Sequence, residues 1–161
     1  MQPHGQDAFD ASIEHHDVFS AAMWGNAWVG YWHAHSTADG CDGAAESIRN
    51  YAHLVDAPID VVAVLGPEVE PRFDAGVRQA AIRATQTIGE VMGRGAVVIA
   101  RRGVLGSLIV SLSTGMLLIA RASRVRVFLD ARDAGAWIAG GGRCEAARIV
   151  GAVERLARPA R

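Results

Sequence analysis

Two short apolar runs, separated by a helix-length segment, most constrain what this chain can fold into. Residues 60–66 and 96–100 contain at most one polar side chain each and are bounded by proline or glycine. Such runs are typical of β-strands that are buried on both faces. Between them, residues 72–92 place apolar side chains at intervals of three and four, which predicts an amphipathic helix. A strand, a crossover helix and a second strand predict a parallel sheet with right-handed connections.

The neighbouring segments extend this alternation in both directions. Residues 17–22 and 27–36 are short runs with aromatic side chains, and Gly25-Asn26 between them favours a hairpin turn. Further patterns predict a helix over 44–55, an apolar helix over 102–121, a half-exposed strand over 124–129, a short helix after Asp130 and an amphipathic helix over 143–158. The expected fold class is α/β, with a single mixed, mostly parallel sheet that opens with a hairpin, is flanked by helices and carries an appended C-terminal helix.

The expected organisation is one domain with an extension at each end. Residues 1–16 are expected to form a flexible N-terminal segment, and residues 17–139 the domain. Residues 140–161 are expected to form a glycine hinge and a C-terminal amphipathic helix, because Gly140-Gly141-Gly142 precedes the last helical pattern. A helix on such a hinge could dock on its own chain or on a second copy, which makes it a candidate for self-association.

Charge divides the chain into two halves. All 16 basic residues are arginine; residues 1–80 carry 12 acidic residues and three arginines, and residues 81–161 carry five acidic residues and 13 arginines. The simpler interpretation is that the halves interleave and neutralise each other; the alternative is a dipolar surface suited to self-association or a charged partner. The formal net charge of −1 predicts no general attraction to nucleic acid or membranes.

The most apolar segment is residues 104–120, which has no charged side chain. It is shorter than the about 20 apolar residues of a membrane span and is interrupted by serines and glycines, so a buried helix is expected. Arginines flank it, but a helix of this length separates them by about 27 Å, too far for one compact nucleic-acid-binding patch. Small residues at spacing four indicate tight packing on the sheet or, in an oligomer, a contact face: Ser107, Ser111 and Gly115.

Cysteine content and the N-terminus predict a reduced, cytoplasmic protein. Cys41 and Cys144 cannot build a disulfide framework, and neither belongs to a CxxC pair. The first 17 residues lack the basic start and apolar core of a signal peptide. The chain also contains no GxSxG elbow, paired-acid motif or HExxH, so neither catalysis nor a cofactor is expected.

Residues 17–138 resemble the STAS domain (sulfate transporter and anti-sigma-factor antagonist) and its SpoIIAA-like relatives. The resemblance rests on the opening hairpin, on the succession of strands and helices, and on the ending VRVFLDARDAGAWI over residues 125–138. It implies a non-catalytic regulatory module. The best-known members bind a kinase-like anti-sigma factor, and phosphorylation of a serine at the start of the second helix controls that contact.

The phosphoserine switch does not carry over to this chain. The corresponding residues 66–73 contain no serine or threonine. Glu68 or Glu70 could supply a standing negative charge, although a carboxylate copies neither the charge nor the geometry of a phosphate. The resemblance therefore implies a SpoIIAA-like protein that binds a protein partner without this switch.

The expected contact surface is the loop 66–73 together with the start of the second helix. Its candidate partner-binding residues are Pro67, Glu68, Glu70, Arg72 and Phe73. Trp24, next to the hairpin turn, is a further candidate, because an exposed indole provides a large contact area at a small cost in entropy.

Two other functions stay open. A carrier of a lipid or another small apolar ligand would need a cavity between the third helix and the sheet. A metal-binding protein or metal-dependent enzyme would use His33 and His35, which one strand face would place about 7 Å apart, a spacing that a single metal ion bridges.

Overall fold

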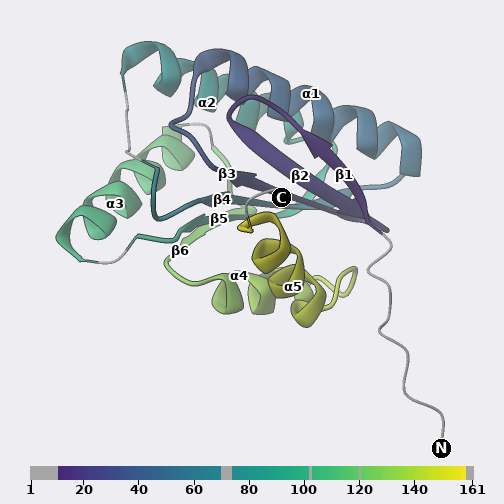
Figure 1. Ribbon diagram of the computed structural model, residues 1–161. Helices are drawn as coiled ribbons and strands as arrows, with labels where there is room; N and C mark the ends of the chain where they lie inside the picture. Colours follow the sequence, from purple (N-terminus) through teal and green to yellow (C-terminus); the bar gives the residue numbers. More distant parts are fainter. Residues whose placement is uncertain (1–10, 70–73, 102, 120, 159–161) are drawn as a thin grey trace, which may run out of the picture.

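The computed structural model describes residues 11–69, 74–101, 103–119 and 121–158, and within them the chain forms six strands and five helices (Figure 1). The strands are β1 (Ser12–His15), β2 (Phe19–Trp24), β3 (Ala27–Trp32), β4 (Ile59–Leu65), β5 (Met92–Ile99) and β6 (Val125–Phe128). The helices are α1 (Ala38–Val55), α2 (Ala75–Ile88), α3 (Val104–Ile119), α4 (Ala131–Ala139) and α5 (Ala146–Leu156).

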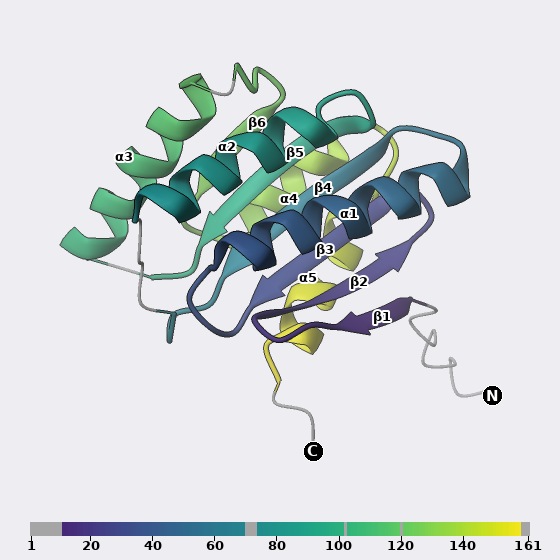
Figure 2. The same ribbon diagram turned by 90° about the horizontal axis from the view of Figure 1, so that it is seen from above.

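All six strands form one mixed sheet whose spatial order equals the chain order, β1-β2-β3-β4-β5-β6. The first three strands pair antiparallel, and β3 to β6 pair parallel. Right-handed crossovers that always step in one direction place their helices on one side of the sheet. Accordingly α1 and α2 cover one face, α3 lies beside α2 at the β6 edge, and α4 and α5 cover the opposite face (Figure 2). The predicted α/β class, with its opening hairpin and C-terminal helix, is confirmed.

The face under α1 and α2 is built around two indole rings on β3. Trp28 and Trp32 have ring centroids 6.3 Å apart and lie on either side of Gly30. A Cβ on Gly30 would lie 2.6 Å from Cζ3 of Trp28 and 3.0 Å from Cζ3 of Trp32, so only glycine leaves room for both rings. The hairpin before them turns at Gly25-Asn26 as predicted, with Gly25 at a positive φ of 48°.

The opposite face is covered by the helical hairpin of α4 and α5. Ile138 of α4 and Ile149 of α5 are fully buried against the strands. The glycines between the two helices are hydrogen-bonded, since the N–H groups of Gly140, Gly141 and Gly142 donate to carbonyls of α4. The apolar face of α5 thus already lies in the core of its own chain, and self-association through this helix stays a prediction.

Several boundaries differ from those predicted. Residues 12–15, expected in a flexible segment, form the edge strand β1. Helix α1 begins earlier than expected, because the side chain of Thr37 caps it by accepting from the N–H of Gly40. The helix predicted over 72–92 ends earlier, at Ile88 with Gly89 as its C-cap, and Met92 and Gly93 instead belong to β5, where the register with β4 shifts.

Candidate functional site

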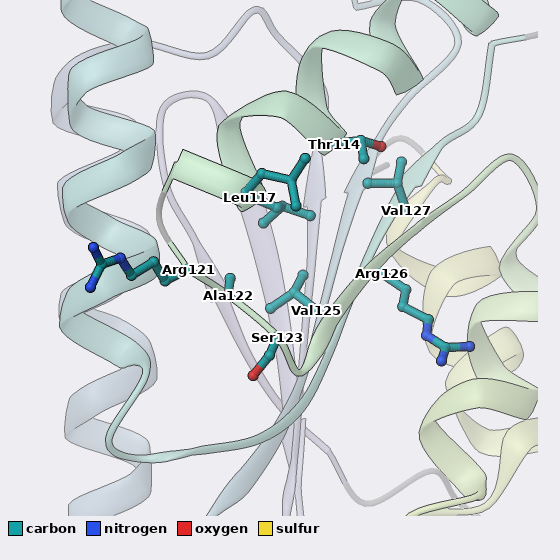
Figure 3. Close-up of a pocket in the computed structure, with 9 residues that line it drawn as sticks. Thr114, Leu117, Arg121, Ala122, Ser123, Val125, Arg126 and Val127 are labelled. Carbon is teal, nitrogen blue, oxygen red and sulfur yellow. The ribbon is translucent and has the colours of Figure 1, made fainter.

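The most distinctive surface feature is a groove between α3 and β6 with a volume of about 620 Å³ (Figure 3). Its apolar lining comes from the end of α3, the connection after it and the strand: Leu117, Leu118, Ala122, Val125 and Val127. Thr114, Ser123, Arg121 and Arg126 complete it. We call this space the α3–β6 groove.

The groove lies beside α3, whose described positions divide between a buried side and an exposed side. Gly106, Ile109 and Ser113 are buried, whereas Leu118 is 76% exposed, in a 16-residue helix without a charged side chain. In the part of the chain that the structure describes, no helix is both long and apolar enough to cross a membrane. At Leu118, the described part of the chain thus leaves apolar surface of α3 uncovered.

The predicted packing of the small-residue stripe on the sheet is wrong. Ser107 and Ser111 are exposed, and each hydroxyl donates to the carbonyl four residues earlier in its own helix or helix start. A Cβ built on Gly115 meets nothing within 4 Å. The stripe points away from the sheet because Gly106, Ile109 and Ser113 form the inward side instead. Together with Leu118 it extends the uncovered surface of α3.

One guanidinium, that of Arg121, lies beside the α3–β6 groove, whereas that of Arg126 lies over Trp137 on the opposite face of the sheet. In Figure 3, Arg121 and Arg126 project away from the groove in opposite directions, which leaves its floor apolar. The guanidinium of Arg126 lies 4.0 Å from the ring centroid of Trp137, a cation–π contact that holds it in place. Arg124 is fixed nearby, since its Nη1 donates to the carbonyl of Met92 at 2.8 Å. The groove is therefore apolar, with the positive charge of Arg121 at its edge.

The predicted contact loop lies elsewhere and is only partly described. Pro67 and Glu68 are exposed, whereas Glu70, Arg72 and Phe73 lie outside the described residues. The hydroxyl of Tyr31 donates to Oε1 of Glu68 at 3.3 Å; burial, and then the charge of Glu68, raises the pKa of Tyr31 to about 12. Neither Pro67 nor Glu68 lines the α3–β6 groove, so the role of the loop stays a prediction.

Trp24 is not the exposed anchor that the sequence suggested. It is only 7% exposed, because β2 continues to this residue and turns its indole into the core under α4 and α5. The guanidinium of Arg148 lies 5.7 Å from its ring centroid. A buried indole cannot present contact area to a partner, so Trp24 belongs to the packing of the fold.

His33 and His35 do not share a strand face. Strand β3 ends at Trp32, and the N–H groups of His33 and Ala34 both donate to the carbonyl of Val18, which bends the chain away from the sheet. Both histidines are exposed. Within the described ranges, no three or more His, Cys, Asp or Glu side chains gather where they could hold a metal ion. The geometry that the metal-binding alternative required is therefore not formed.

A buried polar cluster at the start of β4 escaped sequence analysis. Asp60 is 0% exposed; its Oδ1 accepts from the backbone N–H of Arg94 and from Nη2 of Arg143, both at 2.8 Å. The thiol of Cys144 lies 3.6 Å from Oδ2. An acid in an otherwise apolar strand is the signal that could have revealed it, since a buried carboxylate requires partners.

This cluster is built for structure and not for nucleophilic chemistry. Burial, followed by the charge of Asp60, raises the pKa of Cys144 to about 12, so the thiol is protonated at neutral pH. A Cβ on Gly93 would lie 2.6 Å from Oδ1 of Asp60, which explains the glycine at the shift of register. The cluster joins β4, β5 and the connection between α4 and α5 at one end of the sheet.

The raised pKa of Cys144 predicts a loss of stability at alkaline pH. An unfolded thiol loses its proton near pH 8.5, whereas the folded one keeps it to about pH 12, so the free energy of unfolding falls as the pH rises through this interval. Urea unfolding at pH 8, 9 and 10 should show the decline, and Cys144→Ala should make it shallower. Cys41, whose pKa is about 11, adds the same pH dependence to the wild-type protein and to Cys144→Ala. If stability declines with pH equally steeply in the two proteins, the raised pKa of Cys144 is contradicted.

Comparison of the chain with protein-family models, curated proteins and solved structures finds no match in any of the three. The resemblance to the STAS domain thus stays a prediction, and any function must be argued from the geometry of the chain itself.

Proposed function

We propose that the chain is a non-catalytic regulatory or scaffolding module that binds a protein partner through the α3–β6 groove. The observation that carries the proposal is the apolar lining of this groove of about 620 Å³, in which Leu118, 76% exposed, joins Leu117, Val125 and Val127. Exposed apolar surface with a polar rim is characteristic of protein interaction sites. The small side chains of Ser107 and Ser111 on the same helix allow a partner backbone to approach closely.

The rim defines the chemistry of the partner. Arg121 lies at the groove, and Arg124 belongs to the same connection between α3 and β6, so this end of the groove carries positive charge. The partner is therefore a segment with apolar side chains for the floor and acidic side chains for the rim. Electrostatic complementarity of this kind fixes orientation and accelerates association.

Two further observations support a regulatory module of the predicted kind. The mixed sheet with an opening antiparallel hairpin is the architecture that a STAS-like domain implies. Both cysteines are free, which agrees with the proposed cytoplasmic location. The proposal carries over no phosphoserine switch, because residues 66–73 contain no hydroxyl side chain.

Photo-cross-linking in the cells that produce the protein tests the proposal. A photoreactive residue at position 118 should form a covalent adduct with a partner protein, and mass spectrometry should map the adduct to a segment with apolar and acidic residues. Leu54, 80% exposed on α1, is the matched control position. Adducts of equal yield and identity at both positions, or adducts to segments without acidic residues, would refute the proposal.

A further inference from the structure

The α3–β6 groove runs along an open edge of the sheet. Strand β6 is last in the spatial order of the strands, and within the described residues it pairs with β5 alone. Val125, Arg126 and Val127 all line the groove, although the side chains of successive strand residues point to opposite faces of a sheet. In Figure 3 the side chain of Arg126 points away from those of Val125 and Val127. A space that all three residues border therefore lies along the edge of the strand.

The backbone of β6 has a donor and an acceptor that point away from β5. The N–H of Gly95 on β5 donates to the carbonyl of Arg124 at 2.9 Å. In a parallel ladder the backbone groups of every second residue face the neighbouring strand, so those of Arg126 face β5 and those of Val127 face the free edge. The N–H and carbonyl of Val127 form no hydrogen bond with any of the described residues. Such an edge is a template for pairing with another chain.

The two faces beside this edge differ in chemistry. A strand added to β6 would lie about 4.8 Å away, and its alternate side chains would point to opposite faces. On the groove side these side chains would meet leucines of α3 and valines of β6. On the other side lies the guanidinium of Arg126, an exposed residue, 4.0 Å from the ring centroid of Trp137. Opposite charges on neighbouring strands stabilise their pairing, so an acidic side chain fits there.

We infer that the partner segment binds as an extended strand, which adds to the free edge of β6 and carries alternating apolar and acidic side chains. The inference rests on the proposed function and deepens it, because it specifies how the same groove holds its partner. Apolar side chains at every second position fill the groove, and an acidic side chain between two of them meets Arg126 on the other face. In strand addition, backbone hydrogen bonds supply the affinity and alternate side chains supply the specificity.

A proline at position 127 tests strand addition, because it removes the outward N–H and leaves the ladder between β5 and β6 unbroken. The readout is the adduct that a photoreactive residue at position 118 forms in the cells that produce the protein. Val127→Pro should reduce the yield of this adduct about fivefold or more, since the complex loses one backbone hydrogen bond. Val127→Ala shortens the side chain but keeps the N–H, so most of the adduct should remain.

Two further measurements do not depend on the proline variant. A synthetic peptide with the sequence of the cross-linked segment should slow hydrogen exchange of the Val127 N–H in the unaltered protein, because this group then donates to the peptide. Arg126→Glu should reduce the adduct from position 118, since it places like charges on neighbouring strands. Arg78→Glu, at an exposed arginine of α2, is the matched reversal and should leave the adduct unchanged.

The outcomes separate this inference from the proposed function. Loss of the adduct in a folded Val127→Pro protein, with retention in Val127→Ala, supports strand addition. An adduct that survives Val127→Pro overturns strand addition while the partner proposal stands, and so does a bound peptide that leaves the exchange of the Val127 N–H unchanged. If the proline variant does not fold, as circular dichroism would show, hydrogen exchange decides. Absence of any adduct from position 118 in the otherwise unaltered protein overturns both.

Discussion

Replacing Arg143 by glutamine is expected to lower the free energy of unfolding by about 3 kcal/mol, because it leaves a fully buried carboxylate without its countercharge. Asp60 is 0% exposed, whereas the Arg143 side chain is 35% exposed, so water can partly enter the vacated space. The expected loss therefore lies at the lower end of the about 3–5 kcal/mol that removing one partner of a buried ion pair costs. With total stabilities of about 5–15 kcal/mol for such domains, the loss is a large fraction of the whole. Urea denaturation followed by circular dichroism measures it.

Two controls make the Arg143 result specific. Arg83→Gln breaks an exposed ion pair, Arg83–Asp42, whose side chains are 57% and 55% exposed, and should cost at most about 1 kcal/mol. The double variant Asp60→Asn with Arg143→Gln should be more stable than Arg143→Gln alone, because no buried charge remains while the new amide oxygen can still accept from the N–H of Arg94. Equal losses of unfolding free energy for Arg143→Gln and Arg83→Gln would show that the buried ion pair stabilises the fold no more than the exposed one.

The second large effect is expected from Ile149→Asp on α5, which should leave the chain unfolded at 25 °C. Ile149 is fully buried between α5 and the sheet, so the substitution removes a large apolar side chain and buries an unpaired charge. Ala147→Asp places the same charge on the exposed side of the same helix and should keep the native circular dichroism spectrum. A folded Ile149→Asp protein would contradict the position of α5 in the core.

The position of α5 also decides how self-association should be measured. A chain that ends at Gly140 loses α5 and uncovers the sheet around Val29 and Val62. Aggregation of such a chain would report exposed core and not a natural interface. Sedimentation of the full chain, with and without Leu118→Asp, is the informative comparison.

Sequence patterns predicted those elements whose local composition matches their environment. The apolar run at β4 and the Gly25-Asn26 turn each carry a complete local signal, because burial on both faces and a positive φ restrict the residues allowed there. Strand β1 carries no such signal, since Ser12, Glu14 and His15 are polar and exposed. Only its pairing with β2, a contact between separate segments, makes it a strand.

The candidate site could not be predicted because it, too, depends on contacts between separate segments of the chain. The groove depends on which side of α3 meets the sheet, and an apolar helix without a charged residue gives no pattern that distinguishes its sides. Trp24 was misjudged because the end of β2 lies beyond the predicted strand.

The most direct test of the central claim, that the α3–β6 groove binds a protein segment with acidic residues, is photo-cross-linking from position 118 in the presence of a charge reversal. Arg121→Glu at the rim should strongly reduce the adduct, whereas Arg49→Glu, an exposed arginine on α1, should leave it unchanged. An adduct from position 118 that is unaffected by Arg121→Glu, or equally affected by both reversals, would contradict the claim.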